Sequence, residues 1–292
     1  MSQWLGFEIA KIKIRCNNEQ NDIMQQELPY TNFKMDLETV DISLYYKICK
    51  KLPNPQGKLI YQDERNQIYS SSMILRYIGN YSKRDSLMIA ESCIQYDESD
   101  KRKYEIYLVE ERGLSTKTLF RGMGLEFLMA VNRRIMLHSS FIVWKGKGIV
   151  FTAPPGTGKS TQAELWKKYR QGTEIINGDR SILACDSSDE MPMVYSLPFC
   201  GSSKIALNKN VPLGAIVVLR QGKTNKIQRL AKKEAVSFIF SECTISPWDK
   251  ECMENTLDVL LDIVQRIPVY YFSCLPCSSA VDVLEYSLKS DW

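Results

Sequence analysis

One glycine-bearing stretch, residues 153–161 (APPGTGKST), constrains this chain more than any other part of it. The apolar run at 149–152 before it is typical of a strand, and the segment 160–169 after it favours a helix. A strand, a tight loop and a helix N-terminus bring backbone N–H groups and the positive end of a helix to one point. The stretch therefore predicts a phosphate-binding loop, although a turn that merely precedes a helix is the alternative.

Each part of this loop has an expected chemical role. A side chain at Gly156 or at Gly158 would hold the backbone amides away from phosphate oxygens. We expect the Lys159 ammonium to reach the β- and γ-phosphates of ATP, and the Ser160 hydroxyl to complete a Mg²⁺ shell. Ala153 stands where the usual pattern has glycine, and alanine is small enough to keep the loop. The residues expected to bind the nucleotide are Pro155, Gly156, Thr157, Gly158, Lys159, Ser160 and Thr161.

Length and composition indicate an ordinary globular protein. A chain of 292 residues suggests about two domains, and no apolar run approaches the roughly 20 residues of a membrane span. No export signal is recognisable, and nine cysteines without a framework are read as reduced thiols, so we expect a cytoplasmic protein with no membrane partner. A net charge of +4 gives no strong case for nucleic acid.

The first part of the chain, 1–120, is predicted to be a β-rich N-terminal region that could bind the acceptor. Residues 7–16 alternate as one extended, half-buried strand, whereas 20–30 is read as a loop or a short helix. Two short strands flank a turn at 63–66. Further strands are predicted at 73–78, 87–96 and 104–109, with a polar turn at 97–102 between the last two.

The second part, 121–292, is predicted to be the catalytic domain. Apolar residues at helical spacing predict a helix over 114–137, whose Arg133–Arg134 pair is read as a solvated face rather than a ligand contact. A strand at 138–144 and a glycine turn at 145–148 then predict a hairpin with the strand that enters the phosphate loop. A helix at 251–266 is expected to bury Leu257, Leu260, Leu261 and Val264, and 274–277 (CLPC) is read as a structural turn.

Several stretches in a fixed order resemble the HPr kinase/phosphorylase catalytic domain and its shorter relatives, which share a fold with ATP-dependent phosphoenolpyruvate carboxykinase. They are the phosphate loop and the segments 137–139, 175–179, 197–201, 212–219 and 267–271. The resemblance covers about 135–290 and implies an α/β phosphate-loop kinase domain of that type, with a mixed sheet after the β-rich N-terminal region. It also implies ATP and Mg²⁺ as cofactors, an oligomeric assembly, and serine as acceptor, on a protein, a peptide or a free amino acid.

Two further residues complete the expected catalytic set with Lys159. Asp179 follows an apolar pair and should emerge at a strand end facing the triphosphate. There it could coordinate Mg²⁺, act as general base, or do both. The alternative is an aspartate that only shapes a turn. The family typically has two adjacent aspartates here, and Gly178 in this chain weakens the case for the reverse, phosphorolytic reaction. His138 is the only histidine, and the resemblance places it near the phosphates. Arg180 and Lys204 could neutralise phosphate charge, but surface charge is the default for both.

The leading hypothesis is thus an ATP- and Mg²⁺-dependent kinase that phosphorylates a hydroxyl of a peptide, protein or small molecule. A nucleotide-binding regulatory or scaffold protein that no longer transfers phosphate is the alternative. A nucleic-acid-dependent ATPase would call for a basic groove, which the sequence does not suggest. The carboxykinase reaction itself is disfavoured because those enzymes are much longer.

Overall fold

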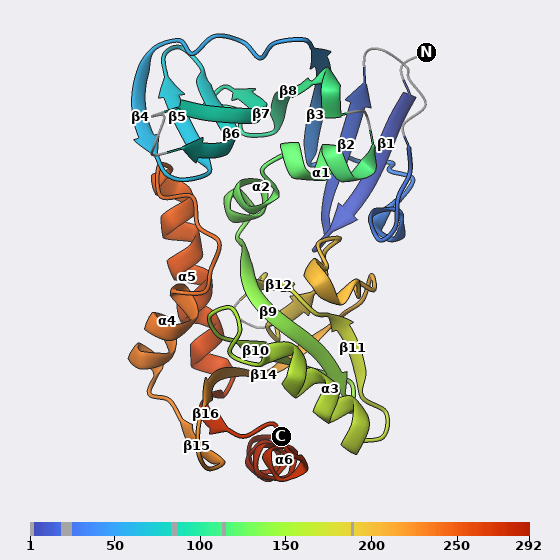
Figure 1. Cartoon of the computed structure of the whole chain (residues 1–292), viewed down its shortest axis with the longest axis vertical. Helices are drawn as coiled ribbons and strands as arrows, with labels where there is room; N and C mark the ends of the chain where they lie inside the picture. The colour runs from blue at the N-terminus through green and yellow to red at the C-terminus, as the bar shows by residue number, and fades with distance from the viewer. Residues whose placement is uncertain (1–2, 19–24, 83–86, 113–114, 188–189) are drawn as a thin grey trace. The chain divides into compact units, whose positions relative to one another are not determined.

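The structure, a computed structural model, describes residues 3–18, 25–82, 87–112, 115–187 and 190–292. It divides the chain into two compact units, Met1–Leu128 and Met129–Trp292, both drawn in Figure 1. The division predicted after residue 120 falls within helix α1 (Thr116–Gly122). Among the described residues, no helix combines the length and apolar character needed to cross a bilayer.

The first unit is built on one mixed sheet with the strand order β1-β2-β3-β8-β7-β6-β5-β4. Strand β3 runs parallel to both of its neighbours, and the other pairs are antiparallel. The strands are β1 (Gln3–Ile9), β2 (Ile12–Asn18), β3 (Ile42–Cys49), β4 (Lys58–Gln62), β5 (Asn66–Ser70), β6 (Ile74–Ser82), β7 (Leu87–Tyr96) and β8 (Lys103–Val109). Short 3-10 helices lie at η1 (Tyr30–Phe33) and η2 (Glu110–Arg112). The β-rich character predicted for this region is confirmed.

Two local predictions in this unit have different outcomes. The hairpin of β4 and β5 is confirmed, and the Asp63 carboxylate accepts the backbone N–H groups of Arg65 and Asn66 at its turn, both at 2.7 Å. The single extended strand over 7–16 is wrong. Ala10 and Lys11 both have left-handed backbones, with φ of 51° and 66°, and form a tight two-residue turn between β1 and β2. Two consecutive left-handed residues match the twist of a hairpin, but Ala-Lys is not among the dipeptides that predict such a turn from sequence. Of the predicted loop at 20–30, positions 20–24 lie outside the described residues.

The second unit contains the sheet β10-β9-β12-β13-β14-β16-β15, with β11 also paired to β9. Strand β10 pairs with β14 as well, so β9, β12, β13, β14 and β10 close into a ring of paired strands. The strands are β9 (Arg134–Trp144), β10 (Lys147–Thr152), β11 (Glu174–Asn177), β12 (Arg180–Ala184), β13 (Met193–Tyr195), β14 (Asn210–Gln221), β15 (Lys226–Arg229) and β16 (Val269–Cys274). The helices are α2 (Leu125–Val131, across the boundary), α3 (Lys159–Tyr169), α4 (Lys232–Phe240), α5 (Lys250–Arg266) and α6 (Ser278–Asp291), with η3 (Gly201–Ser203). Parallel and antiparallel pairs occur together, so the mixed α/β class is confirmed.

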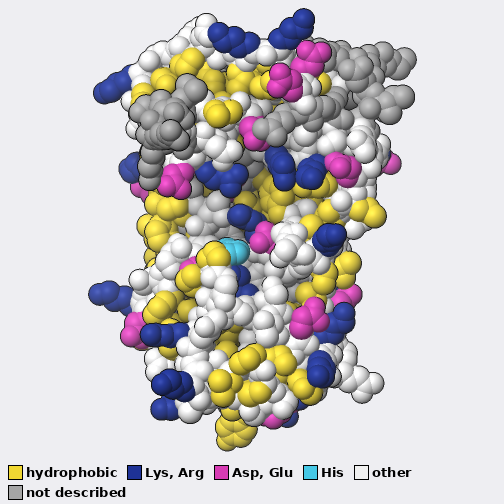
Figure 2. Space-filling view, viewed as in Figure 1, with side chains coloured by type: hydrophobic (Ala, Val, Ile, Leu, Met, Phe, Trp, Pro, Cys, Tyr) yellow, Lys and Arg dark blue, Asp and Glu magenta, His cyan; other side chains and the backbone are white. Residues whose placement is uncertain are grey.

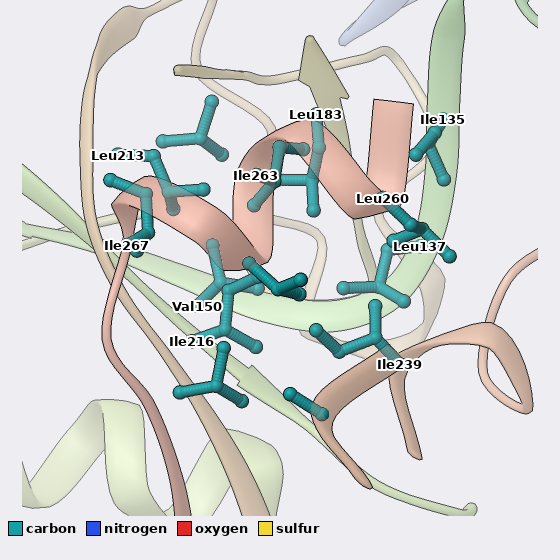
Figure 3. Close-up of a cluster of buried hydrophobic side chains, with 14 of the residues drawn as sticks. Ile135, Leu137, Val150, Leu183, Leu213, Ile216, Ile239, Leu260, Ile263 and Ile267 are labelled. Atoms are coloured by element: carbon teal, nitrogen blue, oxygen red, sulfur yellow. The ribbon is translucent and has the colours of Figure 1, made fainter. Parts of the chain in front are cut away.

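Helices cover both faces of these strands (Figure 1). Val150 of β10 points into a cluster with Ile216 and with Leu260 and Ile263 of α5, and Figure 3 shows these side chains converging. Ile149 and Phe151 point the other way, into a second cluster that includes Trp166 of α3 and Leu284 of α6. Because both faces are buried, β10 reads as a continuous apolar run that enters the loop from the middle of a rigid core.

The helix predicted over 114–137 is wrong beyond Val131, and its position 114 lies outside the described residues. The segment forms α1 and α2, which ends at Val131, and Arg133 then turns the chain with φ of 56°. Strand β9 begins at Arg134 because pairing with β12 supplies its backbone hydrogen bonds. The Arg133–Arg134 pair, predicted to be solvated, has two outcomes: Arg133 is exposed as expected, whereas Arg134 is buried. Arg133 approaches Asp258 and Asp262 of α5 at 3.6 and 3.8 Å, and the buried Arg134 pairs with Asp186 at 2.6 Å.

The predicted helix at 251–266 exists as α5, but its buried stripe is shifted. Leu260 and Val264 are buried as expected, whereas Leu257 and Leu261 are 39% and 48% exposed. The remaining buried positions are Cys252, Thr256, Val259 and Ile263. The turn predicted at 274–277 joins β16 to α6.

Candidate functional site

A hairpin delivers the chain to the phosphate loop. Strands β9 and β10 pair antiparallel up to Trp144 and Lys147, and the turn between them uses left-handed Lys145 and Gly146. Strand β10 ends at Thr152, whose hydroxyl donates to the His138 carbonyl of β9 at 2.9 Å. The predicted hairpin is therefore confirmed, and it ties the entrance of the loop to the histidine.

The backbone of the loop has the form that a bound phosphate needs. Gly156 and Gly158 have φ of 78° and 114°, and open space surrounds the position that a Cβ would occupy at each. Gly158 caps α3 without any side chain, so the first-turn amides of that helix are left for a ligand. Ala153 is fully buried in the apolar cluster of α3, where its methyl group fits. The loop residues present are thus compatible with a polyphosphate.

The side chains of the loop are held by its own carbonyls. Lys159 is buried and donates from Nζ to the Ala153 and Pro154 carbonyls at 2.7 and 3.3 Å. Burial lowers the pKa of Lys159, and the negative charges of Glu242 and Asp179 partly offset this. Phosphate oxygens could replace the two carbonyls as acceptors. Ser160 and Thr161 are exposed at the start of α3.

Asp179 is positioned by a buried asparagine. The Asn177 Oδ1 atom accepts the backbone N–H groups of Asp179 and Arg180 at 2.9 and 3.0 Å, and its Nδ2 donates to the carbonyls of Leu197 and Phe199 at 2.9 Å each. These bonds shape the turn between β11 and β12. The half-buried Asp179 carboxylate then lies 3.4 Å from the Arg180 Nε.

Gly178 has a structural reason to be glycine. A Cβ built there would lie 2.3 Å from the Ser203 Oγ and 2.5 Å from its Cβ, so Ser203 fills the space of any side chain at 178. Lys204, the next residue, is exposed on the same turn. Arg180 and Lys204 were the two cations considered for neutralising phosphate charge. The structure places Arg180 beside Asp179.

His138 lies at the centre of the candidate site. It occupies the middle of β9 opposite Arg180 of β12, and it reaches the surface as the single cyan side chain of Figure 2. Its Nε2 is 3.9 Å from the Asp179 Oδ1. Burial and then the charge of Lys159 lower the pKa of His138, with Asp179 opposing and Arg180 adding to the decrease. A neutral imidazole is therefore favoured at neutral pH.

The structure adds Glu242, which sequence reasoning missed. The segment after α4 pairs with β9: the His138 N–H donates to the Glu242 carbonyl at 3.0 Å, and the Thr244 N–H donates to the Met136 carbonyl at 2.8 Å. The Glu242 Oε2 is 3.9 Å from the His138 Nδ1. Burial raises the pKa of Glu242, and Lys159 opposes this. Across β9, the Arg180 guanidinium donates to the Thr244 hydroxyl at 2.9 Å.

A Mg²⁺ ion at this site would depend on the nucleotide. Among the described parts of the chain, no three His, Cys, Asp or Glu side chains gather in a way that could hold a metal. Mg²⁺ commonly binds through one or two protein oxygens together with substrate phosphates. Ser160 and Asp179 are oxygen donors of that kind, so they fit such an ion.

Comparisons with known proteins matched a protein family and distantly similar solved structures. A family profile described as SynChlorMet cassette protein ScmC matches residues 127–278, more than half of the chain. No curated protein matched the chain. The solved structure of the HPr(Ser) kinase/phosphatase from Coxiella burnetii is similar over 54% of this chain and 99% of that chain, with 12% sequence identity and a TM-score of 0.32.

Proposed function

This chain belongs to the SynChlorMet cassette protein ScmC family, and we propose that it is an ATP- and Mg²⁺-dependent kinase that transfers the γ-phosphate to a hydroxyl group. The observation that carries the proposal is the position of Lys159. The negative charges of Asp179 and Glu242, which flank His138, both act to raise the pKa of the buried Lys159 ammonium. A phosphate-binding loop that faces carboxylates and a cation has the parts that phosphoryl transfer needs.

Each residue has a role in this proposal. The amides of the loop and Lys159 hold the β- and γ-phosphates, and Ser160 and Asp179 hold the metal. A bound Mg²⁺ would neutralise charge on the phosphate oxygens. Arg180 lies next to Asp179, and its positive charge would neutralise charge on the transferring phosphate.

The acceptor and setting follow from the family resemblance in the sequence. We propose a serine hydroxyl on a peptide, a protein or a small molecule, a second unit with the HPr kinase-like fold, and an oligomeric assembly in the cytoplasm. The first unit is proposed to help bind the acceptor. We include neither nucleic acid nor membrane among the partners.

To test this proposal, the protein is incubated with labelled ATP, Mg²⁺ and candidate acceptors encoded beside the gene. Intact mass then shows whether an acceptor has been phosphorylated. Wild-type protein should add one phosphoryl group to an acceptor. Asp179→Asn should lower the transfer rate by about 10²–10⁴-fold if the carboxylate acts in the chemical step, with a much smaller loss of ATP affinity. Asp258→Asn, at an exposed aspartate of α5, is the matched control.

Two results would contradict this assignment. Tight MgATP binding without any phosphorylated acceptor would favour the alternative, a regulatory nucleotide-binding protein. Equal losses of affinity and transfer rate in Asp179→Asn would restrict Asp179 to holding the nucleotide.

A further inference from the structure

The two carboxylates that flank His138 have different surroundings. Asp179 is 29% exposed at its side chain and already lies beside the Arg180 guanidinium. Glu242 is only 12% exposed; its neighbour is the His138 imidazole, and the positive charge of Lys159 acts on it. One carboxylate is therefore paired with an arginine, and the other is half-buried within the field of the phosphate-loop lysine.

The backbone holds Glu242 firmly in this place. The residue lies on an antiparallel bridge to β9, formed where Leu137 meets Cys243 and closed by hydrogen bonds on either side. Strand β9 in turn lies between this segment and β12, which carries Arg180 directly after Asp179. A side chain on paired backbone is positioned more rigidly than one on a free loop, which suits a group that must meet a reacting atom.

We propose that Glu242 is a catalytic residue, the general base that accepts the proton of the attacking hydroxyl. The inference rests on the proposed kinase function and deepens it. The hydroxyl oxygen forms a bond to the γ-phosphorus while the bond from that phosphorus to the β,γ-bridging oxygen breaks. The bonding electron pair stays on ADP, and the hydroxyl proton passes to the Glu242 carboxylate.

This assignment divides the work between the two carboxylates. Asp179, half-buried and adjacent to Arg180, is left to hold the metal. Burial raises the pKa of Glu242, which brings its proton affinity closer to that of a base that works near neutral pH. His138 lies between the two, 3.9 Å from each.

The test uses water as acceptor and the whole 292-residue chain. Single-turnover hydrolysis of MgATP is measured with enzyme in excess, beside the MgATP dissociation constant from calorimetry. Glu242→Gln keeps size and hydrogen bonding but removes basicity, so hydrolysis should fall about 10²–10⁴-fold. The dissociation constant should change by less than about threefold, because a base acts in the transition state. Glu242→Asp retains a carboxylate and should recover part of the rate.

Glu254→Gln is the matched control, because Glu254 is exposed on α5 and pairs with Lys250 one turn earlier on the same helix; its rate should equal that of the wild type. Circular dichroism melting shows whether each variant is folded. Hydrolysis by Glu242→Gln at the wild-type rate would overturn the inference and leave the kinase proposal standing. Equal losses of hydrolysis rate and MgATP affinity in Glu242→Gln would also overturn the inference. The same holds if the wild-type chain binds MgATP without hydrolysing it, because a base at the γ-phosphate would also activate water. A wild-type chain that binds no MgATP would instead remove the kinase proposal, and this inference with it.

Discussion

Replacement of Lys159 by alanine is the most direct test of the phosphate loop. The ammonium is buried and bonded to the Ala153 and Pro154 carbonyls at 2.7 and 3.3 Å, so it is already positioned inside the loop. On nucleotide binding it would exchange neutral carbonyl acceptors for charged phosphate oxygens. Hydrogen bonds to charged groups contribute about 1.5–3 kcal/mol. Loss of one such bond should weaken MgATP binding about 10- to 150-fold.

The fold should tolerate this change. Lys159→Ala removes a cation that is costly to bury, and it deprives two carbonyls of a donor, so we expect a loss of about 1 kcal/mol in the free energy of unfolding. Titration calorimetry with MgATP gives the affinity, and circular dichroism gives the folded state. Lys167→Ala, at an exposed lysine of the same helix, should bind like the wild type. Unchanged affinity in a folded Lys159→Ala variant would show that nucleotide binds elsewhere and would refute the reasoning.

Two more predictions concern the residues around the loop. His138 is the only histidine, so one imidazole NMR signal reports its titration, and its pKa should lie below the ordinary 6.5 because burial and Lys159 disfavour the protonated form. Lys159→Ala should raise that pKa and Asp179→Asn should lower it; shifts of the opposite sign would contradict the electrostatics. Asn177→Ala should lower the free energy of unfolding by about 3 kcal/mol or more, because it removes four hydrogen bonds between the Asn177 side chain and backbone groups of two segments. Urea denaturation measures this, with the exposed Asn210→Ala as control, and a change no larger than that of the control would show that the turn holds without the asparagine.

This chain lacks one of the two adjacent aspartates that the family typically has, and the structure gives a local reason for the glycine that stands there. Sequence comparison suggested that Gly178 leaves the site one carboxylate short. The structure places Ser203 over Gly178, with no room for a side chain. A second carboxylate nevertheless flanks His138, supplied by Glu242 from a segment far along the chain.

Local sequence was sufficient for the features that depend on neighbouring residues. The strand, loop and helix of 149–169 form as predicted because two glycines and an apolar run specify that backbone within a few residues. The hairpin of β9 and β10 is equally local, since its turn joins residues that are adjacent in sequence. Nucleotide binding by this loop remains a prediction.

Other features were decided by tertiary structure because their partners are distant in sequence. The apolar residues at 135–136 suit a helix or a strand equally, and pairing with β12 selects the strand. Glu242 follows an ordinary amphipathic helix and carries no motif. It becomes part of the candidate site only because its backbone pairs with β9, more than a hundred residues earlier, and this pairing brings a half-buried carboxylate beside His138.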